Sequence, residues 1–142
     1  MTRDLNIGRR DGQKAKRIVV ADDDPDVRHI LRKLLEQDYE VVVAEDGLVA
    51  WDLVHSFGPE VLVTDIQMPR LDGLSLCRKL REGGFQRLRI ILYSGRPLTA
   101  QESSSAGADA FVMKSEPLFR LRYLVGRFTG VGAAPARSRP TQ

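Results

Sequence analysis

The sequence of 142 residues is poor in cysteine and contains no long uninterrupted apolar segment. Its single cysteine, Cys77, excludes an internal disulfide and any cysteine cluster that binds a metal. No stretch approaches the roughly 18 apolar residues of a membrane-spanning helix, and the charged N-terminus does not resemble a signal peptide. We therefore expect a cytoplasmic protein without a membrane span.

Acidic residues are scarce at both ends of the chain, although the formal net charge is only +3. Residues 1–17 carry six basic and two acidic side chains, and residues 120–142 carry five arginines and no acid. Neither end contains a recognisable DNA-binding motif, so solvated tails are favoured over nucleic-acid-binding arms. We expect a disordered basic leader over 1–16, one folded domain over 17–128, and a disordered basic tail over 129–142, which is too short for an output domain.

Short apolar runs alternate with helical patterns along the middle of the chain. The Asp24-Pro25 and Asp46-Gly47 pairs are typical of helix starts. Five alternations with short connections predict an α/β fold with one parallel sheet and helices on both faces. The predicted strands are Ile18–Ala21, Glu40–Ala44, Val61–Thr64, Ile90–Tyr93 and Ala110–Met113. The apolar stripe of the first predicted helix comprises Val27, Ile30, Leu31, Leu34 and Leu35.

Polar residues follow four of the five predicted strands. Asp22 and Asp23 follow the first, Asp65 the third, Ser94 the fourth and Lys114 the fifth. Each has an ordinary structural interpretation, because Asp and Ser are common in turns and a lysine at a strand end is usually solvated. Parallel strands, however, bring their carboxyl ends to one edge of the sheet, so these side chains should converge.

The convergent side chains favour phosphoryl chemistry. Two unit charges about 4 Å apart repel by about 4 kcal/mol at an effective dielectric of about 20, so three carboxylates need a counter-charge. Mg²⁺ is held in proteins by carboxylates and water, and an aspartate can act as a nucleophile toward phosphorus. A lysine ammonium and a serine hydroxyl can stabilise the transferred group. The pattern therefore predicts Mg²⁺-dependent phosphorylation of an aspartate.

Three motifs, at residues 18–28 (IVVADDDPDVR), 65–73 (DIQMPRLDG) and 107–114 (GADAFVMK), carry a resemblance to a known family. In these motifs the chain resembles the receiver domains of two-component response regulators, over roughly residues 17–128. The resemblance implies a flavodoxin-like, doubly wound sheet of strand order 2-1-3-4-5. It also implies Mg²⁺ as cofactor, a sensor histidine kinase or histidine phosphotransfer protein as phosphodonor, and an unknown downstream protein target.

The resemblance assigns the metal and the phosphoryl group to particular residues. Asp65 resembles the phosphoacceptor, and Asp22 and Asp23 resemble the acidic pair that binds Mg²⁺, one directly and one through water. The backbone carbonyl of Gln67 falls where the family completes its metal site. Its side chain and that of Arg96 stand at positions that should tune dephosphorylation.

The resemblance also implies a conformational switch. Ser94 stands at the position of the switch hydroxyl and Lys114 at that of the phosphate-binding lysine. Phe111 takes the place of the aromatic that changes rotamer on activation. The face built from the fourth helix, fifth strand and fifth helix is implied as a surface for homodimer formation and output.

The sequence departs from the family pattern after Ser94. Ser115 replaces the proline that usually follows the lysine, so we expect a trans peptide bond, a differently shaped loop and a displaced Lys114. The segment between Ser94 and Lys114 is about two residues short, poor in apolar residues and contains Gly95 in place of a more usual alanine. We therefore predict a short, irregular or mobile fourth helix.

Three functions are compatible with these features. The first is a stand-alone phosphoacceptor receiver, which is not an enzyme in the ordinary sense because it turns over no separate substrate. The second is a degenerate receiver that serves as an unphosphorylated interaction or dimerisation module. The departures at Ser115 and in the fourth helix favour it, but the retention of all five active-site residue types argues against it. The third is a Mg²⁺-dependent phosphatase with an aspartyl nucleophile, disfavoured because Gln67 replaces the second Asp of the Asp-x-Asp motif of those enzymes.

Overall fold

The computed structural model describes residues 15–131, which contain a five-stranded parallel sheet of order β2-β1-β3-β4-β5. This order and direction confirm the predicted fold class. Each predicted strand is present within one residue at either end. The strands are β1 (Arg17–Ala21), β2 (Glu40–Ala44), β3 (Val61–Thr64), β4 (Arg89–Ser94) and β5 (Ala110–Met113).

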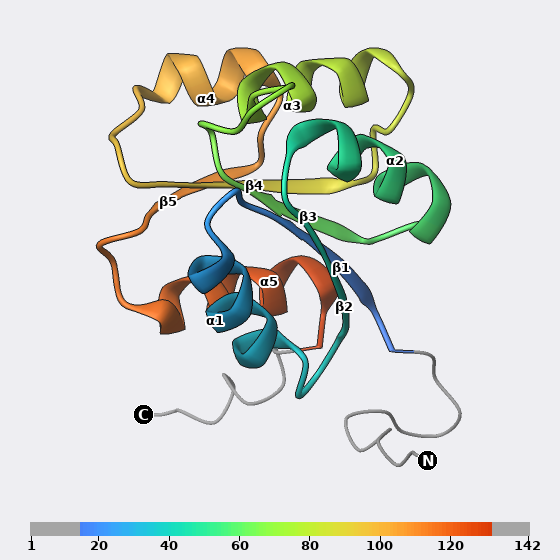
Figure 1. Cartoon of the computed structure of the whole chain (residues 1–142), viewed down its shortest axis with the longest axis vertical. Helices are drawn as coiled ribbons and strands as arrows, with labels where there is room; N and C mark the ends of the chain where they lie inside the picture. The colour runs from blue at the N-terminus through green and yellow to red at the C-terminus, as the bar shows by residue number, and fades with distance from the viewer. Residues whose placement is uncertain (1–14, 132–142) are drawn as a thin grey trace.

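Helices cover both faces of the sheet. Helices α1 and α5 lie on one face, and α2, α3 and α4 lie on the other (Figure 1). Because successive residues of a strand point to opposite faces, Val19 of β1 packs under α2 to α4 and Val20 packs under α1 and α5. The helices are α1 (Pro25–Leu35), α2 (Gly47–Phe57), α3 (Gly73–Glu82), α4 (Ala100–Ala106) and α5 (Leu118–Thr129).

Aspartate side chains begin three of the helices. The carboxylates of Asp24, Asp46 and Asp72 accept backbone N–H bonds from the first turns of α1, α2 and α3. Pro25 occupies the start of α1, where its missing N–H costs no hydrogen bond. The predicted starts at Asp24-Pro25 and Asp46-Gly47 are thus confirmed.

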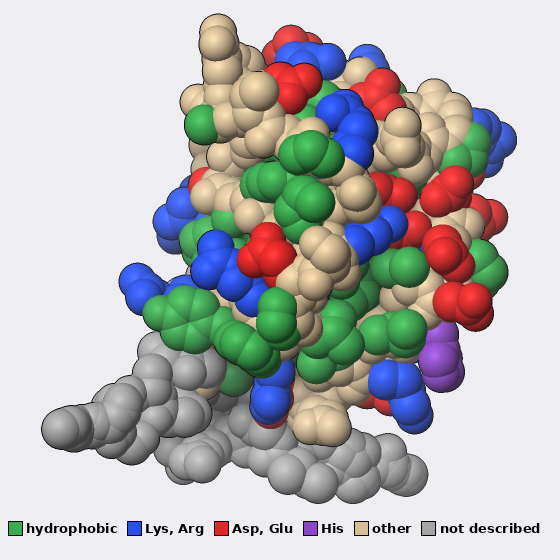
Figure 2. Space-filling model, turned by 90° about the vertical axis from the view of Figure 1, so that its left-hand side faces the viewer, with side chains coloured by type: hydrophobic (Ala, Val, Ile, Leu, Met, Phe, Trp, Pro, Cys, Tyr) green, Lys and Arg blue, Asp and Glu red, His purple; other side chains and the backbone are tan. Residues whose placement is uncertain are grey.

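One predicted core position is wrong. Ile30 falls on the apolar stripe of α1, but its side chain is 47% exposed, whereas Leu31 and Leu35 are buried against the sheet. Phe119 and Tyr123 of α5 are exposed as well, and Figure 2 shows a face on which apolar side chains reach the surface. A helical stripe shows which side of a helix is apolar, but it does not show how far its neighbours cover it.

Helix α4 is short, as predicted, but it is regular rather than irregular. It spans seven residues and begins with a capping box, in which the Thr99 hydroxyl accepts the Glu102 N–H and the Glu102 carboxylate accepts the Thr99 N–H. These two bonds satisfy N–H groups that a helix start leaves free. Ala106 is the buried residue of this helix.

The described residues bear on two further predictions. None of the helices within residues 15–131 has the length and apolar character needed to cross a bilayer. The predicted leader and tail fall almost entirely on residues 1–14 and 132–142, which lie outside the described part of the chain.

Candidate functional site

The predicted site residues meet at the carboxyl edge of the sheet. Asp22 follows β1 and Asp65 follows β3, so the central pair of strands delivers both. Carboxylate oxygens of Asp22, Asp23 and Asp65 all lie within 4.8 Å of one another. Asp22 and Asp65 are 1% and 6% exposed, while Asp23 is open to solvent. The acidic cluster expected from the strand ends is therefore formed.

Lys114 reaches this cluster from the end of β5. Its Nζ lies 2.8 Å from Asp22 Oδ2 and 3.3 Å from Asp65 Oδ2. Burial by itself lowers the pKa of Lys114, but its close contacts with the two carboxylates and their electrostatic attraction outweigh that effect and raise the pKa. The lysine is therefore held as a cation beside the predicted phosphoacceptor.

The predicted displacement of Lys114 is wrong. No cis peptide bond occurs in residues 15–131, so the Lys114–Ser115 bond is trans as expected, yet the lysine side chain still reaches both aspartates. The Lys114 N–H donates to the Ser94 carbonyl at 2.7 Å, which continues the β4–β5 pairing beyond the end of β5. The main chain at Lys114 is therefore held alongside β4, and the change at Ser115 affects only the residues that follow the lysine.

Asp22 carries an incompletely satisfied carboxylate. Its Oδ1 accepts the Asp24 N–H at 2.9 Å, whereas its buried Oδ2 accepts no hydrogen bond of good geometry and has the Lys114 ammonium as its close contact. Burial raises the pKa of Asp22, and although Lys114 opposes this shift the pKa remains above its ordinary value. An under-satisfied oxygen beside two further carboxylates fits a hard divalent cation such as Mg²⁺.

Asp65 is held at the base of the loop between β3 and α3. Its Oδ1 accepts the Ile66 N–H at 2.7 Å, so its Oδ2 faces the Lys114 ammonium. The Gly73 N–H donates to the Ile66 carbonyl at 2.7 Å, and a Cβ at Gly73 would overlap the Asp65 carbonyl oxygen. The glycine is therefore required for the loop to close tightly on the residue that bears the carboxylate.

Ser94 is buried at the end of β4 and available as a donor. Its Oγ accepts the Arg96 N–H at 3.1 Å, so the hydroxyl hydrogen is free to donate to an incoming oxygen. Phe111, two positions before the end of β5, is half-buried against the core under α2 to α4. Both residues thus lie on the two strands that flank the acidic cluster on one side.

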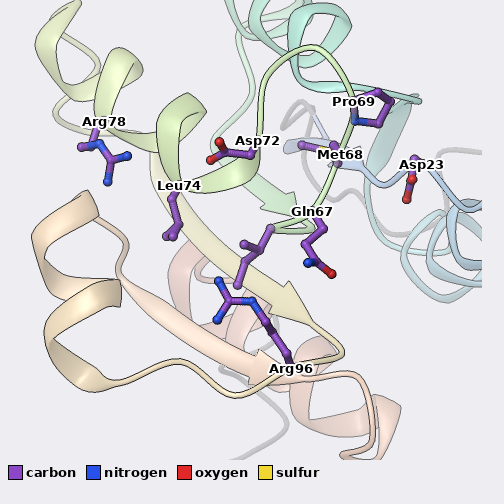
Figure 3. A pocket seen from close by; sticks show the side chains of 9 residues that line it. Asp23, Gln67, Met68, Pro69, Asp72, Leu74, Arg78 and Arg96 are labelled. Carbon is purple, nitrogen blue, oxygen red and sulfur yellow. The ribbon is translucent and has the colours of Figure 1, made fainter.

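A shallow cleft opens beside the acidic cluster (Figure 3). Asp23, Met68 and Leu74 are among the residues that line this cleft. Gln67 enters it from the β3–α3 loop and Arg96 from the loop after β4, on opposite sides. Both side chains are exposed and line the same cleft as Asp23, rather than packing in the core. The predicted tuning residues therefore share one opening.

Sequence reasoning missed three groups that hold this site. The Arg28 guanidinium donates to the Asp22 carbonyl at 2.9 Å, Glu116 bonds the end of β5, and Arg70 pairs with Asp46. Arg28 lies within the first of the three motifs, in which the resemblance assigns roles to the aspartates and none to the arginine. The other two depend on loop geometry, which no spacing in the sequence reveals.

Comparisons with known proteins agree with this geometry. The family model described as the response regulator receiver domain matches residues 18–125. The response regulator MprA of Mycolicibacterium vanbaalenii is 41% identical over 130 residues, which are 84% of this chain and 56% of that protein. MprA of Mycobacterium avium is 42% identical over 118 residues, which are 78% of this chain and 51% of that protein. The chain thus spans about half the length of the curated relatives it matches.

Solved structures show the same fold. The receiver domain of a Francisella response regulator superposes with a TM-score of 0.76 at 28% identity, covering 81% of this chain and 97% of that one. The response regulator TrrA of Thermotoga maritima, solved in complex with Mg²⁺ and BeF, gives a TM-score of 0.72 at 32% identity over 80% of this chain and 98% of that one. The flavodoxin-like fold predicted from the sequence is therefore confirmed.

Proposed function

Because the chain belongs to the family of response regulator receiver domains, we propose that it is a phosphoacceptor switch of a two-component system. Asp65 takes a phosphoryl group, in a Mg²⁺-dependent reaction, from a sensor histidine kinase or a histidine phosphotransfer protein in the cytoplasm. The observation that carries this proposal is the meeting of three carboxylates, the Lys114 ammonium and the buried Ser94 hydroxyl at one sheet edge.

The proposed chemistry is a direct displacement at phosphorus. A carboxylate oxygen of Asp65 forms a bond to phosphorus, the bond from phosphorus to the donor's leaving atom breaks, and the leaving group keeps its electron pair. Bound Mg²⁺, held by Asp22, Asp23, Asp65 and the Gln67 carbonyl, would neutralise the charge that gathers on the phosphoryl oxygens. Lys114 supplies a second positive charge, and the Ile66 N–H holds the other oxygen of the nucleophile.

The proposed switch uses groups that already lie around Asp65. A phosphoryl group attracts the Lys114 ammonium away from the carboxylates and accepts a hydrogen bond from Ser94, which favours one of two existing arrangements. The hydrogen bond from the Lys114 N–H to the Ser94 carbonyl links the two loops that carry these groups, so in this proposal the loops shift together. Phe111 on β5, the strand that ends before Lys114, changes rotamer with these loops. The change alters the α4–β5–α5 face, which binds a target or a second copy of the chain.

The proposed lifetime of the phosphoryl group depends on Gln67 and Arg96. Their side chains border the cleft beside Asp65, where they can admit or exclude a hydrolytic water. The protein performs its own phosphorylation and slow dephosphorylation in this proposal, but it turns over no separate substrate.

The alternative of an unphosphorylated interaction module loses its main support. That hypothesis relied on the departures at Ser115 and in the fourth helix, whereas Lys114 Nζ lies within 3.3 Å of both buried aspartates and α4 forms a regular helix. The module remains the outcome to consider if phosphorylation fails.

Exposure to acetyl phosphate tests the proposal. The full chain is incubated with acetyl phosphate and Mg²⁺, and the intact mass is measured, with EDTA and Asp65→Asn as matched controls. We expect one phosphoryl adduct that requires Mg²⁺ and is absent from Asp65→Asn. A folded protein that binds Mg²⁺ and gains no adduct would favour the unphosphorylated module.

A further inference from the structure

The turn that follows β5 is closed by two reciprocal hydrogen bonds. The Met113 N–H donates to Glu116 Oε2 at 2.8 Å, and the Glu116 N–H donates to the Met113 carbonyl at 2.9 Å. Arg120, in the first turn of α5, contacts the other carboxylate oxygen of Glu116 at 3.1 Å. Glu116 is therefore tied to the end of β5 through both its backbone and its side chain.

Within residues 15–131, the Met113 N–H has no partner on a neighbouring strand. Strand β5 is the edge of the sheet and pairs with β4 alone. Lys114 donates its N–H toward β4, to the Ser94 carbonyl, so the N–H of the preceding residue points to the open edge. The Glu116 carboxylate occupies that position and satisfies a donor that would otherwise face solvent.

These bonds fix the main chain on both sides of the lysine. The main chain at Lys114 is bonded to Ser94 at the end of β4, and the preceding residue, Met113, is bonded to Glu116. Ser115, between Lys114 and Glu116, lacks the ring by which a proline would restrict its φ angle. The Lys114 side chain then spans the distance to Asp22 and Asp65 from a fixed base. A loop without these bonds would let the base of the side chain move relative to the carboxylates.

We propose that Glu116 is a positioning residue for Lys114: by closing the turn with Met113, it holds the ammonium at Asp65 in a chain that has serine at position 115. The inference rests on the proposed function, because its consequence is a faster phosphorylation of Asp65. Glu116 contacts neither the phosphoryl group nor the metal ligands in this assignment. It acts through Lys114.

Single substitutions separate the hydrogen bond from the ion pair. Glu116→Ala removes the acceptor, Glu116→Gln retains a side-chain oxygen that can accept the Met113 N–H, and Arg120→Ala removes only the ion pair. With acetyl phosphate and Mg²⁺, we expect Glu116→Ala to lower the phosphorylation rate constant about tenfold, since small misplacements of reacting groups cost up to about 100-fold. Glu116→Gln and Arg120→Ala should stay within about threefold of the wild type.

A double substitution separates positioning from general stability. If Glu116 acts through Lys114, then adding Glu116→Ala to Lys114→Ala should not slow the reaction further, because the two effects are not additive. Urea denaturation of each variant confirms that the protein is folded at the assay temperature. Equal slowing by Glu116→Ala in both backgrounds would overturn the proposal, as would a Glu116→Ala protein that reacts at the wild-type rate.

Amide exchange tests the assignment even if the wild type accepts no phosphoryl group. Exchange at Met113 and Lys114 should be faster in Glu116→Ala than in the wild type and restored in Glu116→Gln. Unchanged exchange at both amides would show that Glu116 does not hold the turn. Absence of phosphorylation with altered exchange would instead refute the proposed function and leave the turn as described.

Discussion

At the scale of single residues, Asp22 is retained at a cost to stability. Burial raises its pKa, so near neutral pH the folded state holds a carboxylate that is less favourable there than in the unfolded chain. Its Oδ2 lacks a well-formed hydrogen bond, and the Lys114 ammonium and the Asp24 N–H offset the charge only in part. A buried carboxylate that destabilises the fold is expected where its charge serves to bind a cation.

Replacing Asp22 by Asn should therefore stabilise the metal-free protein. We expect the free energy of unfolding at pH 7 to rise by on the order of 1 kcal/mol, because a neutral side chain escapes the desolvation penalty of the buried carboxylate. Added Mg²⁺ should stabilise the wild type and leave Asp22→Asn unchanged. Urea denaturation with and without Mg²⁺ measures both effects, and a destabilised Asn variant would show that the pairing with Lys114 outweighs the burial penalty.

Gln67 should affect the phosphoryl group and leave the metal alone. Its side chain is exposed in the cleft beside Asp65, and the metal role assigned to this residue uses its backbone carbonyl. Gln67→Ala should therefore change the dephosphorylation half-life while the Mg²⁺ dissociation constant stays within about twofold, as expected for a surface change that removes no ligand. Calorimetry gives the constant, and a large loss of Mg²⁺ affinity would contradict the assignment.

Strand order alone predicts the site residues that stand at strand ends, but it misses Arg70 and Glu116, whose contacts depend on loop geometry. Asp22, Asp65, Ser94 and Lys114 could be placed because parallel strands end at one edge whatever the details of packing. Glu116 could not, since its role depends on a free N–H at the open edge of β5.

At the scale of elements, the β3–α3 loop is joined to the start of α2 by an ion pair between Arg70 and Asp46. Arg70, in the loop, adopts a left-handed backbone conformation with φ of 73°. Its Nε and Nη2 atoms lie 3.1 and 3.0 Å from Asp46 Oδ2, while Asp46 Oδ1 accepts the Val49 N–H and caps α2. One buried carboxylate thus begins a helix and holds the loop that follows the phosphoacceptor.

This dual role predicts a dependence of stability on acid. The Val49 N–H bond first, and then Arg70, lowers the pKa of Asp46 below its ordinary value in the folded state. Because its pKa is lower in the folded state, ionised Asp46 stabilises the fold at pH values above its ordinary pKa, near 3.8. This contribution is lost as the pH falls through the pKa of the folded state. Asp46→Ser retains a capping hydroxyl without a titrating group, so its unfolding free energy should fall less steeply below about pH 4. Urea denaturation across this range measures the slopes, and equal slopes would contradict the assignment.

Helix α4 should open more readily than α1. It has seven residues with Ala106 as the buried one, whereas α1 has eleven and buries Leu31 and Leu35. Fewer buried apolar contacts lower the free energy of local opening. Amide exchange over residues 98–106 should therefore be faster than over α1, and equal protection of the two segments would be inconsistent with this expectation.

The regularity of α4 and the exposure of Ile30 show where reasoning from composition stops. The serine triplet in α4 argues against a helix, but the capping box of Thr99 and Glu102 outweighs it at so short a length. The stripe of α1 is apolar at Ile30, yet no neighbouring element covers that position. Both outcomes depend on a local bond or a neighbour that a periodic pattern does not contain.

At the scale of the whole molecule, the strand order brings most of the site residues together. Strand order β2-β1-β3-β4-β5 places β1 and β3 side by side, so their acidic residues meet, and it places β4 and β5 at one side, so Ser94 and Lys114 approach together. This arrangement follows from alternating strands and helices, which is why the fold and the acidic cluster could be predicted. The exposure of side chains such as Phe119 could not be predicted in the same way, because it depends on which neighbouring elements cover them.

Trapping the phosphoryl group on its residue decides whether this arrangement is a phosphoacceptor site. The protein is treated with acetyl phosphate and Mg²⁺, reduced with borohydride to convert an aspartyl phosphate to homoserine, and digested with trypsin. Cleavage after Arg17, Arg28, Lys33 and Arg70 separates residues 18–28, which contain Asp22 and Asp23, from residues 34–70, which contain Asp65. We predict homoserine at Asp65 alone. Reduction within residues 18–28, or none in a protein that is folded and binds Mg²⁺, would contradict the assignment of Asp65.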